Sequence, residues 1–257
     1  MHGADPDNDP NRFTRSTDMN DASSVALSAQ LAALHQTDVI ANNLANLSTT
    51  GFKGEHLLFS EYLTQTSSGL PVSFVQEIGT ARDTSQGPIT QTGNPLDVAI
   101  QGDGFFTVDT PLGSRYTRNG HFQLDADRQI VTSQGYPVLS DGGSPLVIPD
   151  GGGEITIGAD GSVSTTQGTA GKIGTASFAN AQDLTPTAGG FYTTDQTPQA
   201  ATNTKLVQGA VEGSNVEAII EITRLIAAER NVEFTKTFIN AQASLTSTAL
   251  DRLGKTV

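Results

Sequence analysis

The chain has 257 residues, a formal net charge of −13 from 14 basic and 27 acidic residues, and no cysteine. The excess negative charge repels phosphate backbones and anionic membrane surfaces, which excludes nucleic-acid binding from the expected functions. The absence of cysteine excludes disulfides, thiolate metal sites and cysteine nucleophiles.

Residues 1–22 are predicted to be a disordered N-terminal extension. They contain five aspartates and two prolines but almost no apolar residues, so they cannot bury enough surface to offset the entropy of ordering. They also lack the apolar region of a cleaved secretory signal, and no apolar run in the chain approaches the length of about 18 residues that membrane insertion requires. Met19, just before the first predicted helix, is a candidate native start, which would make residues 1–18 an upstream extension.

A helix is predicted from residue 23 to about residue 47, in a segment that continues as a linker to residue 69. The helical stretch has no glycine or proline, and Leu27, Leu31 and Leu34 follow the i, i+4, i+7 spacing of one helix face. A second apolar set repeats this spacing on another face: Ile40, Leu44 and Leu47. The change of face indicates that the two halves of the helix pack against different neighbours.

Three asparagines lie at the end of this helix. Asn42 and Asn43 are four and three residues before Asn46, so the three amides share one strip of the helix surface. An amide both donates and accepts hydrogen bonds, so the strip can enter a helix–helix contact without the desolvation cost of an ion pair. The alternative is a fraying helix end, where asparagine is common, and the residues alone favour neither interpretation.

An all-β domain of short strands is predicted over residues 70–207. Apolar and polar residues alternate in short runs that are separated by Gly, Asp, Asn and Pro. The alternating pairs are Val98/Ile100, Phe106/Val108, Phe122/Leu124, Leu146/Ile148 and Ile155/Ile157. Hairpin turns are expected at residues 125–128 and 159–162, the second because its Asp-Gly pair favours the positive φ angles of such turns.

Candidate catalytic, cofactor and metal sites are weak. The four histidines are scattered and form no HExxH motif, so no catalytic or metal-binding residue is assigned. The Gly102–Gly104 stretch lacks the third glycine and the following helix of a nucleotide loop, and a turn between two strands is expected there. The acidic, glycine-rich residues 141–143 and 150–154 match neither the EF-hand nor the RTX calcium loop and are interpreted as solvated hairpin tips. No cofactor is expected.

The longest predicted helix runs from residue 214 to 253, within a C-terminal segment that spans residues 208–257. It contains no glycine or proline, and Gly254 follows it as a C-terminal cap. Ser214 and Glu217 have the spacing of a capping box at its start. At ~1.5 Å per residue the helix would extend roughly 60 Å, which is too long for the core of a domain of this size.

This C-terminal helix has two apolar faces. A heptad register that includes Ile222, Leu225, Val232 and Ile239 is expected to pair with the N-terminal helix. A second apolar set lies outside that register: Ile219, Ile220, Ile226, Phe234, Phe238 and Leu245. A pair of helices covers only one face, and leaving the second in water would forgo on the order of 10 kcal/mol. Other copies of the chain, or other proteins, are therefore expected to cover it.

Three sequence motifs follow one another along the chain. The first is ANNLAN at residues 41–46 followed by Thr50, Gly51, Phe52 and Lys53. The second is Asn94, Pro95 and the residues up to Gly102, Asp103, Gly104, Phe105 and Phe106, followed by residues 116–120. The third is Glu212, Gly213, Ser214, Asn215 and Val216, followed by Glu221, Arg230, Glu233 and Lys236. These motifs resemble those of the flagellar basal-body rod family, which comprises rod and hook axial proteins. Their order and the span they cover make the resemblance specific.

The resemblance implies an α+β fold in which long N- and C-terminal helices form a coiled-coil-like layer around an export channel, with a central all-β domain outside it. It implies a structural, non-enzymatic subunit of the periplasmic rod, exported by the flagellar type III apparatus, whose partners are other copies and neighbouring rod proteins. The expected helical assembly interface consists of Leu27, Leu31, Leu34, Asn42, Asn43, Asn46, Ile222, Leu225, Val232 and Ile239.

Chain length and the opening segment resemble proximal rod subunits, and a distal rod subunit is the alternative. A secreted fibre or adhesin subunit would share the β-rich centre, but it would not need matched motifs at both termini. A glycosidase that uses carboxylates such as Asp97 and Asp103 is a remote enzymatic alternative.

Overall fold

The computed structural model describes residues 11–65, 71–151, 153–201 and 203–254, which divide into two compact units. The helical unit comprises Met1–Asn42, Glu55–Ala81 and Ile219–Val257, and the β-unit comprises Asn43–Gly54 and Arg82–Ala218. Residues 55–81 group with the terminal helices in this division. Within the described residues, no helix is both long and apolar enough to cross a membrane.

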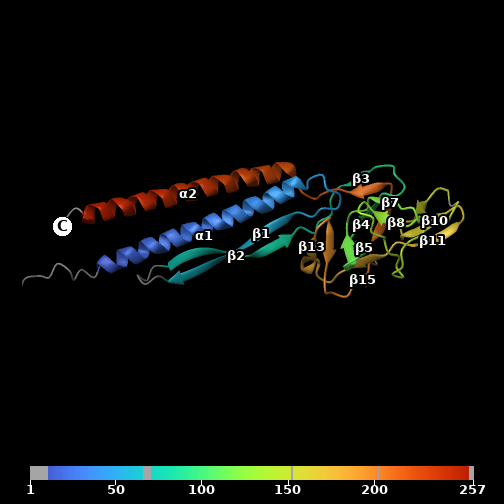
Figure 1. Ribbon diagram of the computed structural model, residues 1–257, viewed down its shortest axis with the longest axis horizontal. Coiled ribbons are helices and arrows are strands. Elements are labelled where there is room, and N and C mark those ends of the chain that lie inside the picture. Colours follow the sequence, from blue (N-terminus) through green and yellow to red (C-terminus); the bar gives the residue numbers. More distant parts are fainter. Residues whose placement is uncertain (1–10, 66–70, 152, 202, 255–257) are drawn as a thin grey trace, which may run out of the picture. The chain divides into compact units, whose positions relative to one another are not determined.

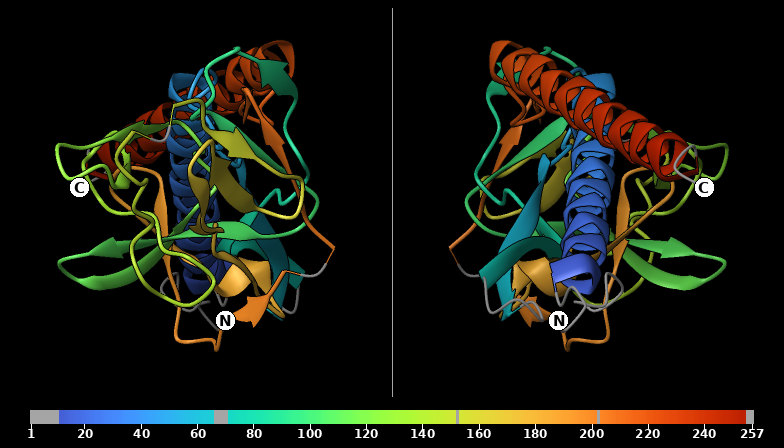
Figure 2. Two further views of the ribbon diagram at one scale, coloured as in Figure 1. Left: turned by 90° about the vertical axis from the view of Figure 1, so that its right-hand side faces the viewer. Right: turned by 90° about the vertical axis from the view of Figure 1, so that its left-hand side faces the viewer.

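The helical unit is built from two long helices and a pair of strands. Helix α1 (Asn11–Ala45) and helix α2 (Ala218–Gly254) pack together and run in opposite directions, and β1 (Glu55–Gln65) pairs with β2 (Pro71–Arg82) in a two-stranded sheet (Figure 1). Viewed end-on, α2 is inclined to α1 (Figure 2). The predicted α+β class with long terminal helices is confirmed.

Helix α1 begins at Asn11 rather than at residue 23. Residues 11–22, expected to be disordered, are helical because no glycine or proline follows Pro10 until Gly51, so nothing in that stretch interrupts helical hydrogen bonding. The low apolar content of this stretch was a weaker guide than its lack of helix breakers. Residues 1–10, also expected to be disordered, lie outside the described residues.

Three of the buried residues of α1 recur every seven positions, and two of these are alanines. Ala26, Ala33 and Ile40 are buried, whereas the predicted stripe of Leu27, Leu31 and Leu34 is about half exposed, at 53%, 51% and 42%. Successive residues project about 100° apart around a helix, so a stripe displaced by one position faces a different direction. The buried face of α1 therefore contains Ala26 and Ala33, each directly before an exposed leucine of the predicted stripe.

The predicted capping box at the start of α2 is wrong, because the helix begins at Ala218. The Ser214 hydroxyl accepts a hydrogen bond from the Val216 amide at 3.3 Å instead of capping a helix. The side-chain amide of Asn215 is hydrogen-bonded within the β-unit, where it accepts from Gly54 N at 2.8 Å and donates to Asp83 O at 2.9 Å. These tertiary hydrogen bonds hold the segment out of the helical conformation that its sequence permits.

The β-unit consists of short strands, one turn of 3₁₀ helix and their connections. Its elements are β3 (Ile89–Gln91), β4 (Val98–Gln101), β5 (Phe105–Thr110), β6 (Gly113–Thr117), β7 (Phe122–Leu124), β8 (Ile130–Thr132), β9 (Thr156–Ile157), β10 (Ser162–Thr165), β11 (Gly168–Lys172), β12 (Thr175–Ser177), η1 (Ala181–Asp183), β13 (Thr185–Thr187), β14 (Phe191–Thr193), β15 (Gln199–Ala200), β16 (Lys205–Gln208) and β17 (Ala210–Glu212).

The strands of the β-unit pair in antiparallel fashion. The largest sheet has the order β13-β14-β6-β5-β12-β15, and a three-stranded sheet has the order β11-β10-β9. The remaining pairs are β16-β4, β17-β3 and β7-β8. Strands β16 and β17, near the end of the unit, therefore pair with β4 and β3 near its beginning. The first and last strands of the unit are thus hydrogen-bonded to each other.

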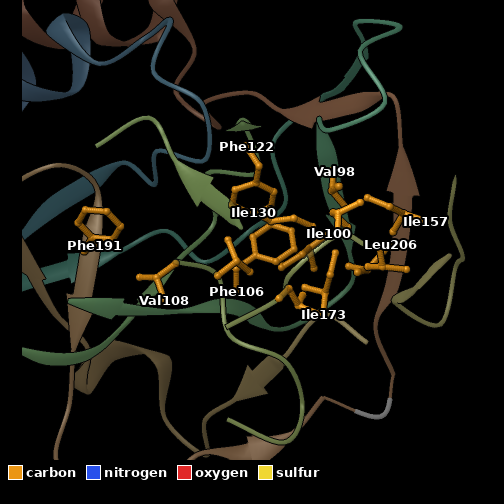
Figure 3. Close-up of a cluster of buried hydrophobic side chains, with 14 residues drawn as sticks. Val98, Ile100, Phe106, Val108, Phe122, Ile130, Ile157, Ile173, Phe191 and Leu206 are labelled. Atoms are coloured by element: carbon orange, nitrogen blue, oxygen red, sulfur yellow. The ribbon is translucent and has the colours of Figure 1, made fainter. Parts of the chain in front are cut away.

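The core of the β-unit contains the residues that the alternating pattern predicted (Figure 3). Buried members include Val98, Ile100, Phe106, Val108, Phe122, Leu146, Ile148 and Ile157, with Leu124 and Ile155 partly buried against them. The rings of Phe106 and Phe122 meet edge to face with centroids 5.0 Å apart. Both predicted hairpin turns are also present, between β7 and β8 and between β9 and β10.

Candidate functional site: a buried ion cluster

Three charged side chains meet in the interior of the β-unit. Glu212, at the end of β17, is fully buried, and its two carboxylate oxygens bind different cations. Oε1 accepts from Lys53 Nζ at 2.6 Å, and Oε2 accepts from Arg118 Nη1 at 3.1 Å. The Gly87 amide donates to Oε1 at 3.0 Å as well. One carboxylate therefore joins three segments that are distant in the sequence.

The two cations are also hydrogen-bonded to backbone carbonyls. Lys53 Nζ donates to Ser85 O at 2.6 Å, and Arg118 Nη2 donates to Gly102 O at 2.9 Å. Burial lowers the pKa of the Lys53 ammonium below its ordinary value, although the hydrogen bond and the charge of Glu212 act in the opposite direction. The guanidinium of Arg118 also lies over the Phe105 ring, 5.2 Å from its centroid.

Backbone contacts join the segment after α1 to the segment before α2. Gly51 N donates to Glu212 O at 2.7 Å, and Asn215 N donates to Phe52 O at 3.4 Å. Gly51 has φ +70, and a Cβ there would lie 2.5 Å from the backbone carbon of Arg118. Glycine is thus required at this position both by its backbone conformation and by the close approach of a neighbouring segment.

Gly51→Ala is expected to lower the free energy of unfolding of the β-unit by about 2–4 kcal/mol, because it adds a left-handed alanine and a steric overlap with backbone. Gly135→Ala is the matched control, since Gly135 has φ +84 but a Cβ at that position would meet no other atom within 4 Å. The control should lose only about 1–2 kcal/mol. Urea denaturation of both variants measures the difference, and equal losses would show that the overlap is relieved without cost.

The other residues of the central motif fix loops around this cluster. Asp97 is buried and accepts from Thr92 Oγ1 at 2.6 Å and from Asn94 Nδ2 at 3.0 Å, and it also contacts His121 Nδ1 at 2.7 Å. Pro95 O accepts from Gln208 Nε2 at 2.9 Å. These contacts give the Asp97 carboxylate a loop-fixing role.

The Gly102–Gly104 turn connects β4 to β5, as predicted. Gly102 has φ +100, and a Cβ there would lie 2.7 Å from Asn203 O. Asp103 is exposed, and its carbonyl accepts a hydrogen bond from Thr204 Oγ1. Across the described ranges, His, Asp and Glu side chains form no group of three or more arranged to hold a metal ion.

The three asparagines of the predicted amide strip have different environments. Asn43 is buried, Asn46 is half-buried and accepts from Thr49 Oγ1 at 3.0 Å, and Asn42 is exposed. Asn42 belongs to the helical unit, whereas Asn43 and Asn46 belong to the β-unit. Helix α1 ends at Ala45, and the chain continues in turns.

The predicted heptad register of α2 is only partly buried. Ile222 is exposed, while Leu225, Val232 and Ile239 are half-buried. The second apolar face is exposed in the chain by itself, with all six members among the exposed large apolar residues: Ile219, Ile220, Ile226, Phe234, Phe238 and Leu245. Ile219 and Phe234 are exposed at 81% and 74%.

Sequence reasoning identified Lys53 as a motif residue but did not predict that it meets Arg118 and Glu212. A usable signal is present at Glu212, which follows Ala210 and Val211 in a strand whose other residues are apolar. A charged residue in such a setting is expected to be buried only with a partner of opposite charge. The identity of the partners depends on contacts across 159 and 94 residues of sequence.

Three protein-family models match segments of the chain that include the cluster. Residues 24–53 match the flagella basal body rod protein family, residues 99–165 match the D1 domain of the flagellar hook protein FlgE/F/G, and residues 207–252 match the C-terminal region of the flagellar basal body rod FlgEFG proteins. Lys53, Arg118 and Glu212 each lie in a different one of these matched segments.

Curated relatives are similar over most of the chain. The flagellar basal-body rod protein FlgF of Caulobacter vibrioides is 39% identical over 243 residues, which cover 92% of this chain and 99% of that protein. FlgF of Mesorhizobium japonicum is 35% identical over 92% of this chain and 99% of its own length. The basal-body rod protein FlgG of Bacillus subtilis is 34% identical, over 76% of this chain and 85% of its own length.

Proposed function

The chain belongs to the flagellar basal-body rod protein family and is FlgF-like, and from this premise we propose that it builds the proximal rod by helical polymerisation through α1 and α2. The family is structural and non-enzymatic. FlgF of Caulobacter vibrioides is more identical to the chain, at 39%, than FlgG of Bacillus subtilis is, at 34%, which supports the proximal over the distal position.

The exposed apolar face of α2 carries this proposal. Fully burying one large apolar side chain contributes about 1.5–3 kcal/mol, and the six such side chains on the second apolar face of α2 lie exposed in the chain by itself. The exposed leucines of α1, Leu27, Leu31 and Leu34, add to this surface. Subunits that pack these faces together would gain enough free energy to order an assembly.

The contact between subunits in such a rod is heterologous, because one face of a subunit meets a different face of the next. A heterologous contact whose rotation does not close generates a helical filament instead of a ring. In this proposal the amide strip of Asn42, Asn43 and Asn46 contributes polar contacts, and the half-buried Leu225, Val232 and Ile239 join the intersubunit layer. The β-unit forms the outer part of the rod.

The proposed partners are other copies of the chain, neighbouring rod proteins and the flagellar type III export apparatus. In this proposal, export by that apparatus places the subunit in the periplasm. The location is supported by the relatives, which are named as basal-body rod proteins.

Immunogold labelling of purified hook–basal bodies tests this function directly. The protein should be present in the purified structures, with label confined to the part of the rod nearest the cell body, as a proximal subunit requires. Label along the distal rod would identify the FlgG-like alternative, and absence of the protein from intact hook–basal bodies would contradict the proposal. A strain that lacks the protein supplies the background for the labelling.

A further inference from the structure

A cavity of about 290 Å³ lies beside the ion cluster within the β-unit. Its lining combines charged and aromatic side chains: Lys53, Arg82, Arg118, Asp103, Phe105 and Phe178. Three cations thus face the cavity against one carboxylate, and that carboxylate belongs to an exposed residue. In a chain of net charge −13, this is an unusual concentration of positive charge.

The buried cations beside the cavity share a single strong counter-charge. Lys53 and Arg118 are 3% and 5% exposed, and each binds one oxygen of Glu212. The charge of Asp83 also acts on Lys53, but less than that of Glu212. Since an incompletely compensated buried charge is costly, a further anion in the cavity would be stabilised by both cations.

Arg118 also has a buried donor without an acceptor. Its Nη1 and Nη2 atoms donate to Glu212 and Gly102, but its Nε atom has no hydrogen-bond partner among the described residues. A buried N–H group left in this state is destabilising. The Nε atom is buried, so Arg118 presents its positive charge to the cavity but not this donor.

We propose that the cavity is a carboxylate-binding site and that an acidic side chain of a second copy of the chain occupies it in the rod. Guanidinium and ammonium groups bind carboxylates through short, charge-assisted hydrogen bonds, and the rings of Phe105 and Phe178 suit the methylene groups of an aspartate or glutamate. The inference rests on the proposed function, since a second copy reaches the cavity only in an assembly.

Charge complementarity supports a second copy as the source of the carboxylate. The chain has 27 acidic residues against 14 basic ones. Several of the acidic residues lie exposed next to glycines in turns of the β-unit, among them Asp141, Asp150 and Asp160. A neighbouring copy therefore presents many protruding carboxylates to a cavity whose charged lining consists of three cations and one carboxylate.

The first test titrates the full-length protein with glutarate and follows backbone amide resonances around the cavity by NMR. Glutarate should shift these resonances, and Arg82→Gln should weaken binding at least tenfold. Arg115→Gln is the matched control, because Arg115 does not line the cavity, and it should leave binding unchanged. Thr84→Trp should also weaken binding, since the exposed Thr84 lines the cavity and the indole would occupy its volume. Failure of glutarate to bind the folded wild-type protein would overturn the proposal.

The second test asks whether the occupant comes from another subunit. Arg82→Glu and Thr84→Trp should each reduce incorporation into hook–basal bodies at least fivefold, whereas Arg115→Glu should not. Thermal unfolding of each purified variant verifies its fold, and Thr84→Trp, which changes no charge, provides the decisive result if Arg82→Glu does not fold. Glutarate binding together with normal incorporation of Thr84→Trp would overturn the assignment to a neighbouring subunit.

These outcomes are separable from failure of the proposed function. If the protein were absent from hook–basal bodies altogether, the polymerisation proposal would fail whatever the cavity binds. Suppose that the wild-type protein is incorporated and that Phe234→Asp, in the exposed apolar face of α2, is not. If Arg82→Glu and Thr84→Trp are then incorporated normally, the polymerisation proposal stands and the cavity inference fails.

Discussion

Glu212→Gln is expected to lower the free energy of unfolding of the β-unit by about 3–5 kcal/mol, the usual loss when one partner of a buried ion pair is removed. The variant keeps the size and most hydrogen-bonding capacity of the side chain, but it leaves Lys53 and Arg118 buried without their shared negative charge. Such a loss is a large fraction of the roughly 5–15 kcal/mol that stabilises an ordinary domain.

Tyrosine fluorescence during urea unfolding measures this effect, because three of the four tyrosines, Tyr116, Tyr136 and Tyr192, lie in the β-unit and the chain has no tryptophan. Glu233→Gln is the control, since Glu233 is 73% exposed and its nitrogen–oxygen distance to Lys236 is 4.0 Å. An exposed pair of this kind contributes about 0–1 kcal/mol. A loss below about 1 kcal/mol for Glu212→Gln would mean that groups other than Glu212 balance the charges of Lys53 and Arg118.

Phe234→Asp is expected to abolish incorporation into the rod while leaving the β-unit folded. Phe234 is 74% exposed in the helical unit, so the substitution removes little packing within the chain by itself. In an assembly that buries this face, the same substitution places a carboxylate in an apolar contact without a partner, which costs several kcal/mol at each repeated interface. Motility assays and immunoblots of purified hook–basal bodies report the outcome.

Asn240→Asp is the matched control for Phe234→Asp. It also adds a carboxylate at an exposed position of α2, but six residues further along and therefore about 240° around the helix. Full motility is expected for this variant. Wild-type rod incorporation of Phe234→Asp would show that this apolar face does not contact other subunits. Leu225→Asp, on the half-buried register, should also block incorporation but should disturb the helical unit more.

Local patterns predicted the core of the β-unit well because its strands obey a two-residue period. Phe106 and Val108 are buried and Thr107 between them is less so, as the alternation indicated. The turn before Ser162 was equally readable, since Gly161 supplies φ +89 between β9 and β10. In both cases the physical cause lies within a few residues of the feature, so the sequence alone was sufficient.

Features that depend on distant partners could not be read in this way. The capping box at Ser214 failed because Asn215 hydrogen-bonds to Gly54 and Asp83. The sheet of β1 and β2 was missed because Leu57, Leu58 and Phe59 are consecutive and show no alternation. The ion cluster was predicted only as separate motif residues, because the family motifs show which positions matter but not which of them meet.

The pairing of Lys53 with Glu212 delays the completion of folding while the chain is being synthesised. The two residues are 159 positions apart, and at a synthesis rate of ~5–20 residues per second the second follows the first by roughly 8–30 s. Strands β3 and β4 likewise cannot form their antiparallel pairs until β17 and β16 have been synthesised. The β-unit therefore cannot complete its fold until most of the chain has been made, which leaves a long interval in which an exporter could take up the chain unfolded.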